Sequence, residues 1–143
     1  MARTIALILM MALAVVTAAA QQGKPELKKT PVTYTSPVSG AEMYRSYCAA
    51  CHGKDAKGQG PAAPALKVAP TDLTLLSKKN GGKFPTEHFS AVLSCKAAIP
   101  AHGSQDMPVW GNIFWKMSQG HQAELQQRVF NLSTYVQSLQ EKK

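Results

Sequence analysis

Five consecutive residues, Cys48-Ala49-Ala50-Cys51-His52, constrain this chain more than any other feature of its sequence. Two thiols three positions apart lie about one helical turn from each other, so both reach one edge of a porphyrin. The adjacent histidine then lies beneath the iron as an axial ligand. The spacing is typical of covalent haem attachment through Cys48 and Cys51, and the rest of the chain has to fold around that group.

Three other interpretations of the motif are weaker. A zinc site needs a second pair of ligands; Cys95 with His88 or His102 would supply one, but their spacing fits no finger or ribbon pattern. A thioredoxin-like redox pair requires a βαβ context, which is missing here. A structural disulfide would leave His52 unexplained.

The first 20 residues indicate export. Arg3 is followed by an apolar run from Ile5 to Val16 and by small residues ending at Ala20. This pattern is typical of a secretory signal peptide, and the run is short for a transmembrane helix, which takes about 20 apolar residues. An uncleaved membrane anchor is the alternative. We therefore divide the chain into a signal peptide (1–20), a polar, proline-rich arm (21–38) and one domain (39–143).

The chain carries a formal net charge of +8, and much of it lies near the motif. From Cys48 through Lys83 there are six lysines and only two aspartates. A basic face of this kind steers an acidic protein partner into encounter. Nucleic acid is a poor candidate for an exported chain with no recognition motif.

Local signals predict the helices. Ser39 and Glu42 are spaced as a capping box, which predicts a helix from Gly40 through Cys51. The glycines and prolines after His52 predict a loop that wraps the cofactor. Further helices are expected from Asp72 through Leu76, from 85 to about 96, and around Met117, with a loop over 97–109.

The last predicted helix, 121–140, has the clearest pattern. Apolar residues recur at steps of four and three, which places them on one face of a helix: Leu125, Val129, Leu132, Val136 and Leu139. No alternating strand pattern of useful length occurs. The fold class is therefore all-α.

The chain resembles the class I c-type cytochromes. The resemblance covers about Ser39 to Gln140 and rests on the Cys-x-x-Cys-His motif and on Met107-Pro108-Val109-Trp110. It implies four to five short helices wrapped around one covalently attached haem c. It also implies that the first and last helices pack together, with Tyr44 against Tyr135 or Leu132.

The resemblance implies that Met107 is the second axial ligand of the iron, opposite His52. Met117 is better explained as core. A haem ligated by His52 and His102, and an open sixth position, are the alternatives. Methionine ligation raises the reduction potential and blocks small-molecule chemistry at the metal.

Other residues receive roles from the same resemblance. The carbonyl of Pro61, in Gly60-Pro61, is expected to accept the hydrogen bond of the His52 ring, with Pro64 as the alternative. Leu66 and Trp110 are expected to line the haem pocket, together with Leu73, Phe84, Phe89 and Ile99. Cys95 is a departure from the family: we expect a buried thiol, and a reactive thiol or an intermolecular bridge is the alternative.

These features favour a periplasmic electron carrier, not an enzyme, that exchanges single electrons with redox partners. A haem-bearing subunit of a larger oxidoreductase, docked through the arm, is the alternative. An enzyme or sensor with an open iron is a weaker one.

Overall fold

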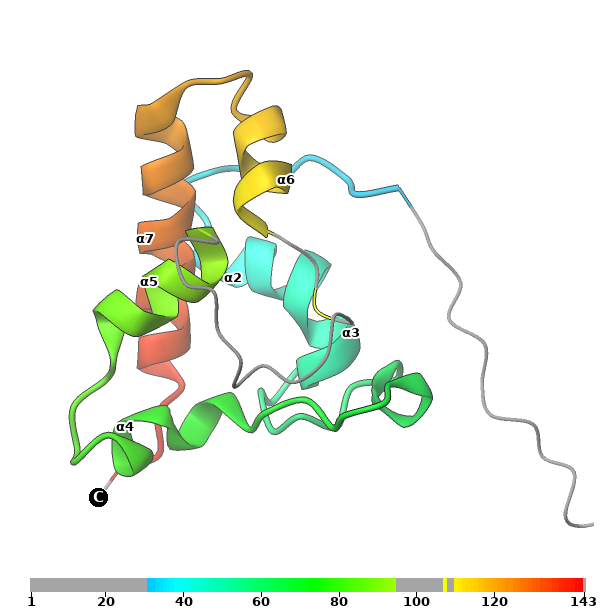
Figure 1. The fold of residues 1–143 in the computed structure, drawn as a ribbon, viewed down its shortest axis with the longest axis vertical. Helices are drawn as coiled ribbons and strands as arrows, with labels where there is room; N and C mark the ends of the chain where they lie inside the picture. The colour runs from blue at the N-terminus through cyan, green and yellow to red at the C-terminus, as the bar shows by residue number, and fades with distance from the viewer. Residues whose placement is uncertain (1–30, 95–106, 108–109, 143) are drawn as a thin grey trace, which may run out of the picture.

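The computed structural model describes residues 31–94, 107 and 110–142, and this part of the chain is helical with no strand (Figure 1). The segments in chain order are α2 (Gly40–Met43), the π-helical η1 (Tyr44–Cys48), α3 (Ala49–His52), the 3-10 helices η2 (Ala63–Ala65) and η3 (Leu73–Leu75), α4 (Leu76–Lys79), α5 (Thr86–Ser94), α6 (Trp110–Met117) and α7 (Gln122–Ser138). The predicted all-α class is confirmed. None of the described helices is long and apolar enough to cross a membrane.

The first helical run begins where the sequence predicts. Ser39 is the N-cap of α2, and its side chain accepts a hydrogen bond from the Glu42 backbone N–H at 3.2 Å. Helical backbone then continues to His52, one residue beyond the predicted end. The sequence did not predict the π-helical segment η1 inside this run. Such segments recur at functional sites, and this one ends at Cys48.

Helix α2 crosses α7 at a point of close backbone approach (Figure 1). A Cβ on Gly40 would collide with the backbone carbonyl of Asn131 and with Tyr135, so only glycine fits at the crossing. One turn later the rings of Tyr44 and Tyr135 pack with their centroids 5.4 Å apart. The predicted contact between the terminal helices is confirmed.

The apolar face of α7 forms one side of the core. Val129, Leu132 and Val136 are buried, as the spacing predicted, whereas Leu125 and Leu139 are half-buried. They join buried residues of the earlier helices, which are Met43, Tyr44, Tyr47, Leu93, Trp110 and Phe114. The core thus connects the helix that carries the cysteine motif with α5, α6 and α7.

The chain before α2 is part of the domain from about Thr33 on. Thr35 is buried, and Arg128 and Asn131 of α7 donate hydrogen bonds to the carbonyls of Thr35 and Pro37. The predicted start of the domain at Ser39 is therefore several residues too late. Because this stretch has no apolar pattern of its own, its sequence resembles a linker. The signal peptide and residues 21–30 of the arm lie outside the described residues.

Candidate haem pocket

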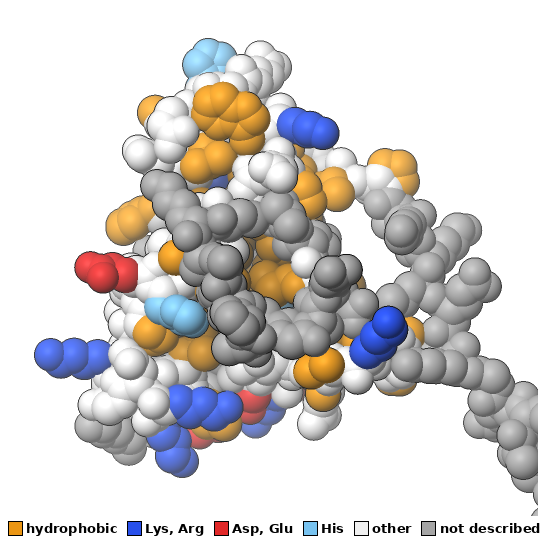
Figure 2. Space-filling view, viewed as in Figure 1, with side chains coloured by type: hydrophobic (Ala, Val, Ile, Leu, Met, Phe, Trp, Pro, Cys, Tyr) orange, Lys and Arg blue, Asp and Glu red, His pale blue; other side chains and the backbone are white. Residues whose placement is uncertain are grey.

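A cavity of about 330 Å³ opens among α3, α5, α6 and the loop that follows α3. In Figure 2 hydrophobic side chains appear at several places on the face that is shown, from its top to its lower half, and several lysine or arginine side chains lie at its lower left, over the α4 region. The residues around the cavity are mainly apolar and include Tyr47, Leu66, Leu73, Leu76, Phe89, Val92, Leu93, Trp110 and Val136. Such a lining excludes water from a bound group.

The residues of the cysteine motif line this cavity together. Cys48 is the last residue of η1, and Cys51 and His52 belong to the final turn of α3. Burial raises the pKa of the Cys48 thiol to about 12, with a smaller contribution from Cys51. The unmodified Cys48 thiol therefore stays protonated at neutral pH in this fold.

The His52 ring is oriented by a backbone carbonyl from the following loop. Its Nδ1 lies 3.0 Å from the carbonyl oxygen of Thr71. A histidine that ligates a metal commonly donates its second ring nitrogen in this way. The prediction that Pro61 supplies this carbonyl is wrong: Pro61 is exposed and does not line the cavity.

The role of the Gly60-Pro61 region is to fold the loop back onto α3. The last carbonyls of a helix have no partner within it. Here the N–H groups of Gly58, Gly60 and Ala62 donate to the carbonyls of His52, Cys51 and Ala50 at 2.8, 3.0 and 2.9 Å. A Cβ on Gly60 would collide with the Ala50 carbonyl, so this residue must be glycine. The loop then continues to Thr71, which lies 19 residues after His52.

Met107 lines the same cavity as His52 and the two cysteines. Met117 does not: it lies in α6, where its sulfur is 3.5 Å from the Tyr47 hydroxyl oxygen. Of these two methionines, Met107 is therefore the one that lines the cavity. His102, the alternative ligand, lies outside the described residues.

The structure places the remaining predicted residues as follows. Leu66, Leu73, Phe89 and Trp110 line the cavity. Phe84 does not line it but packs against Phe89, with ring centroids 5.5 Å apart. Ile99 and Cys95 lie outside the described residues. Within the described ranges no cluster of three His, Cys, Asp or Glu side chains is arranged to hold a metal ion.

Two lining residues were not predicted. Tyr47 directly precedes Cys48, and its ring packs on Trp110 with centroids 5.2 Å apart. His88 also lines the cavity, from the first turn of α5. Tyr47 could have been proposed from its position beside the motif, whereas an exposed helix residue such as His88 gives no signal in the sequence.

The donor set of this cavity fits a c-type haem. Two thiols one turn apart, an imidazole that is held by a carbonyl, and a thioether all reach one apolar space. These are the groups that form two thioether bonds and both axial bonds to iron in such proteins.

The fold and this cavity define a c-type cytochrome domain. Residues 35–114, which are more than half of the chain, match the sequence model of the family described as cytochrome C oxidase, cbb3-type, subunit III. The chain belongs to this family, and membership indicates haem-based electron transfer. No curated protein and no solved structure matches the chain.

Proposed function

We propose that this protein transfers single electrons through one haem c that is attached to Cys48 and Cys51 and ligated by His52 and Met107. The observation that carries the proposal is that all four side chains line one cavity although Met107 lies 55 residues after His52. A haem with both axial positions filled supplies reversible one-electron exchange and little else. The protein is then a carrier and not a catalyst.

The chain's own residues set the properties of the bound group. The Thr71 carbonyl fixes the tautomer and the orientation of the His52 ring. Leu66 and Trp110 exclude water from the cavity, which tunes the reduction potential. The Met107 thioether favours the reduced iron and thereby raises the potential.

The setting of this electron transfer is also a proposal. The N-terminal sequence supports export to the periplasm. All six lysines from Cys48 through Lys83 are exposed, whereas the Asp72 carboxylate accepts hydrogen bonds from the backbone N–H and the hydroxyl of Thr74. The surface around this segment therefore suits redox partners with acidic docking sites.

A second candidate function is a haem-bearing subunit of an oxidoreductase complex. The description of the matching family, a subunit of a cytochrome c oxidase, favours it. A free carrier migrates as a monomer after mild extraction from its native host, whereas a subunit co-migrates with a larger assembly that has oxidase activity.

The ligand assignment is tested by a potentiometric titration of the haem-loaded protein and of Met107→Leu, which keeps an apolar side chain but removes the sulfur. The native protein should titrate as a single one-electron couple. The variant should show a potential lower by on the order of 0.1 V, a small part of the ~0.8 V range that axial ligands span. Met43→Leu, at a buried methionine that does not line the cavity, is the matched control and should leave the potential near the native value. Equal potentials for the native protein and Met107→Leu would rule out Met107 as the ligand.

A further inference from the structure

Residues 33–37, which precede the first helix, lie across α7 and reach the wall of the haem pocket; we call this segment the strap. Thr35, in its middle, is 3% exposed. Arg128 Nη1 donates to the Thr35 carbonyl at 2.9 Å, and Asn131 Nδ2 donates to the Pro37 carbonyl at 2.9 Å. Two side chains of α7 therefore fix the strap at two points.

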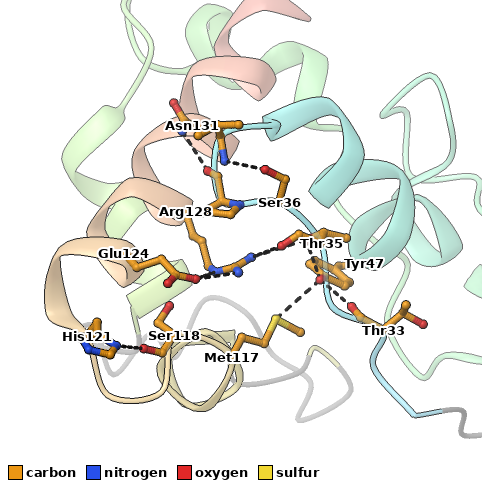
Figure 3. Close-up of polar contacts among 12 residues, drawn as sticks. Thr33, Thr35, Ser36, Tyr47, Met117, Ser118, His121, Glu124, Arg128 and Asn131 are labelled. Carbon is orange, nitrogen blue, oxygen red and sulfur yellow. Dashed lines mark hydrogen bonds and ion pairs between the residues drawn. The ribbon is translucent and has the colours of Figure 1, made fainter.

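Arg128 is fully buried, which is unusual for a charged side chain. Its Nε and Nη2 donate to one carboxylate oxygen of Glu124, at 3.2 and 2.8 Å, and its guanidinium carbon lies 4.9 Å from the centre of the Tyr34 ring. A buried charge is tolerated only when it is paired and hydrogen-bonded. Figure 3 shows the guanidinium held between Glu124 and Thr35, so its position depends on the strap.

A directed series of hydrogen bonds leads from Arg128 to Tyr47. Arg128 Nη1 also contacts the Thr35 Oγ1 at 3.5 Å, and that oxygen lies 2.7 Å from the Tyr47 hydroxyl, which donates to the Thr33 carbonyl at 2.7 Å. The Tyr47 hydroxyl has one proton and donates it to the Thr33 carbonyl, so the Thr35 hydroxyl is the donor in its contact with Tyr47, while its oxygen accepts from Arg128. The Tyr47 hydroxyl is thereby fixed by two strap residues (Figure 3).

Tyr47 joins the two halves of the haem pocket. It precedes Cys48 in the chain and lines the cavity. Its ring packs on Trp110 and Phe114 of α6, with centroids 5.2 and 6.0 Å away. Trp110 begins α6 three residues after Met107. A shift of Tyr47 would therefore move the wall that supports the segment carrying Met107.

We propose that Arg128 is a positioning residue of the haem pocket: through Thr35 it fixes Tyr47, and through Tyr47 it keeps Met107 in place as the sixth ligand. The inference rests on the proposed function. It makes the strap a part of the electron-transfer site, although neither the strap nor Arg128 lines the pocket.

The test uses the haem-loaded, oxidised protein and measures its midpoint potential and the rate at which cyanide replaces the native sixth ligand. Thr35→Val and Tyr47→Phe each remove one hydroxyl and keep the shape of the side chain. Both should speed cyanide binding about tenfold, which corresponds to about 1.4 kcal/mol, and both should shift the midpoint potential. Arg128→Met should do the same in the native background and add nothing when combined with Tyr47→Phe, because both changes break one series of contacts.

Leu125→Ala is the matched control. Leu125 is a half-buried α7 residue that lines a separate groove between α5 and α7, so the variant loosens the helix without touching the strap. The proposal is overturned if Thr35→Val and Tyr47→Phe bind cyanide at the native rate, or if Leu125→Ala speeds it equally. These two hydroxyl variants decide the question even if Arg128→Met does not fold.

Failure of the ligand assignment can be distinguished from failure of the positioning role proposed for Arg128. If the native oxidised protein lacks the far-red sulfur-to-iron band, Met107 is not the ligand and the proposed function is wrong in that respect. The part of the proposal that concerns Met107 then fails together with the ligand assignment. The midpoint potentials of Thr35→Val and Tyr47→Phe still test whether the strap positions Tyr47 in the haem pocket: shifted potentials support that role and native potentials overturn it.

Discussion

At the scale of single residues, some groups of the site can be recognised in the sequence by their side chains, and others cannot. Cys48, Cys51 and His52 could be selected from the sequence because their chemistry and spacing are specific. Met107 was selected from the resemblance to the c-type cytochromes, and all four residues line one cavity. The Thr71 carbonyl that contacts His52 could not, because a backbone carbonyl is the same at every residue. Its place depends on how the loop folds back onto α3.

Tyr44 provides a prediction at this scale. Its hydroxyl is buried and donates to the carbonyl of Gly53, the residue after the motif, at 2.7 Å. Tyr44→Phe leaves that carbonyl without its donor, and the free energy of unfolding should fall by about 1–3 kcal/mol. Urea unfolding of the haem-loaded protein measures this free energy, and Tyr34→Phe is the control at an exposed tyrosine.

The same residue should make stability depend on alkaline pH. Burial, with a smaller contribution from Cys48, raises the pKa of Tyr44 above its ordinary value. Above about pH 10 the phenol ionises in the unfolded chain but not in the folded one. The stabilisation is therefore complete below about pH 10 and is lost as the pH rises further. Tyr44→Phe should lose less stability than the native protein between pH 8 and 10.5, and an equal loss would contradict this account.

At the scale of helices, local signals predicted the starts and the buried faces, and long-range contacts decided the rest. The Ser39 cap and the spacing of apolar residues in α7 were sufficient for those elements. The π-helical segment Tyr44–Cys48 and the packing of the strap were not predicted. The strap is held by Arg128, whose partner Thr35 lies 93 residues away in the sequence. No local sequence pattern predicts a contact over such a separation.

The crossing of α2 and α7 gives a prediction at this scale. Helix propensity alone predicts that Gly40→Ala stabilises the protein by up to ~1 kcal/mol. The close contact with the Asn131 backbone predicts that the variant is destabilised, because a methyl group has no space there. We expect a loss of about 1–3 kcal/mol or more from overpacking, measured by urea unfolding. A gain in stability would show that the two helices do not approach so closely.

At the scale of the whole molecule, the net charge of +8 and the exposed lysines around the motif predict that electrostatic attraction guides the encounter with an acidic redox partner. The rate of electron transfer to an acidic redox partner should fall roughly tenfold as salt shortens the Debye length from about 30 Å to a few ångströms. Lys79→Glu, in α4, should slow the reaction at low salt more than Lys116→Glu, in α6. A rate that does not depend on ionic strength would contradict a role for the basic face.

The absorption spectrum of the oxidised and reduced protein, produced in a host with haem-attachment machinery, tests the central claim most directly. The account predicts the bands of a covalently bound c-type haem in the reduced protein, together with the weak far-red sulfur-to-iron band in the oxidised protein. Haem bands without the far-red band would contradict ligation by Met107, and the absence of covalent haem would contradict the role assigned to Cys48 and Cys51.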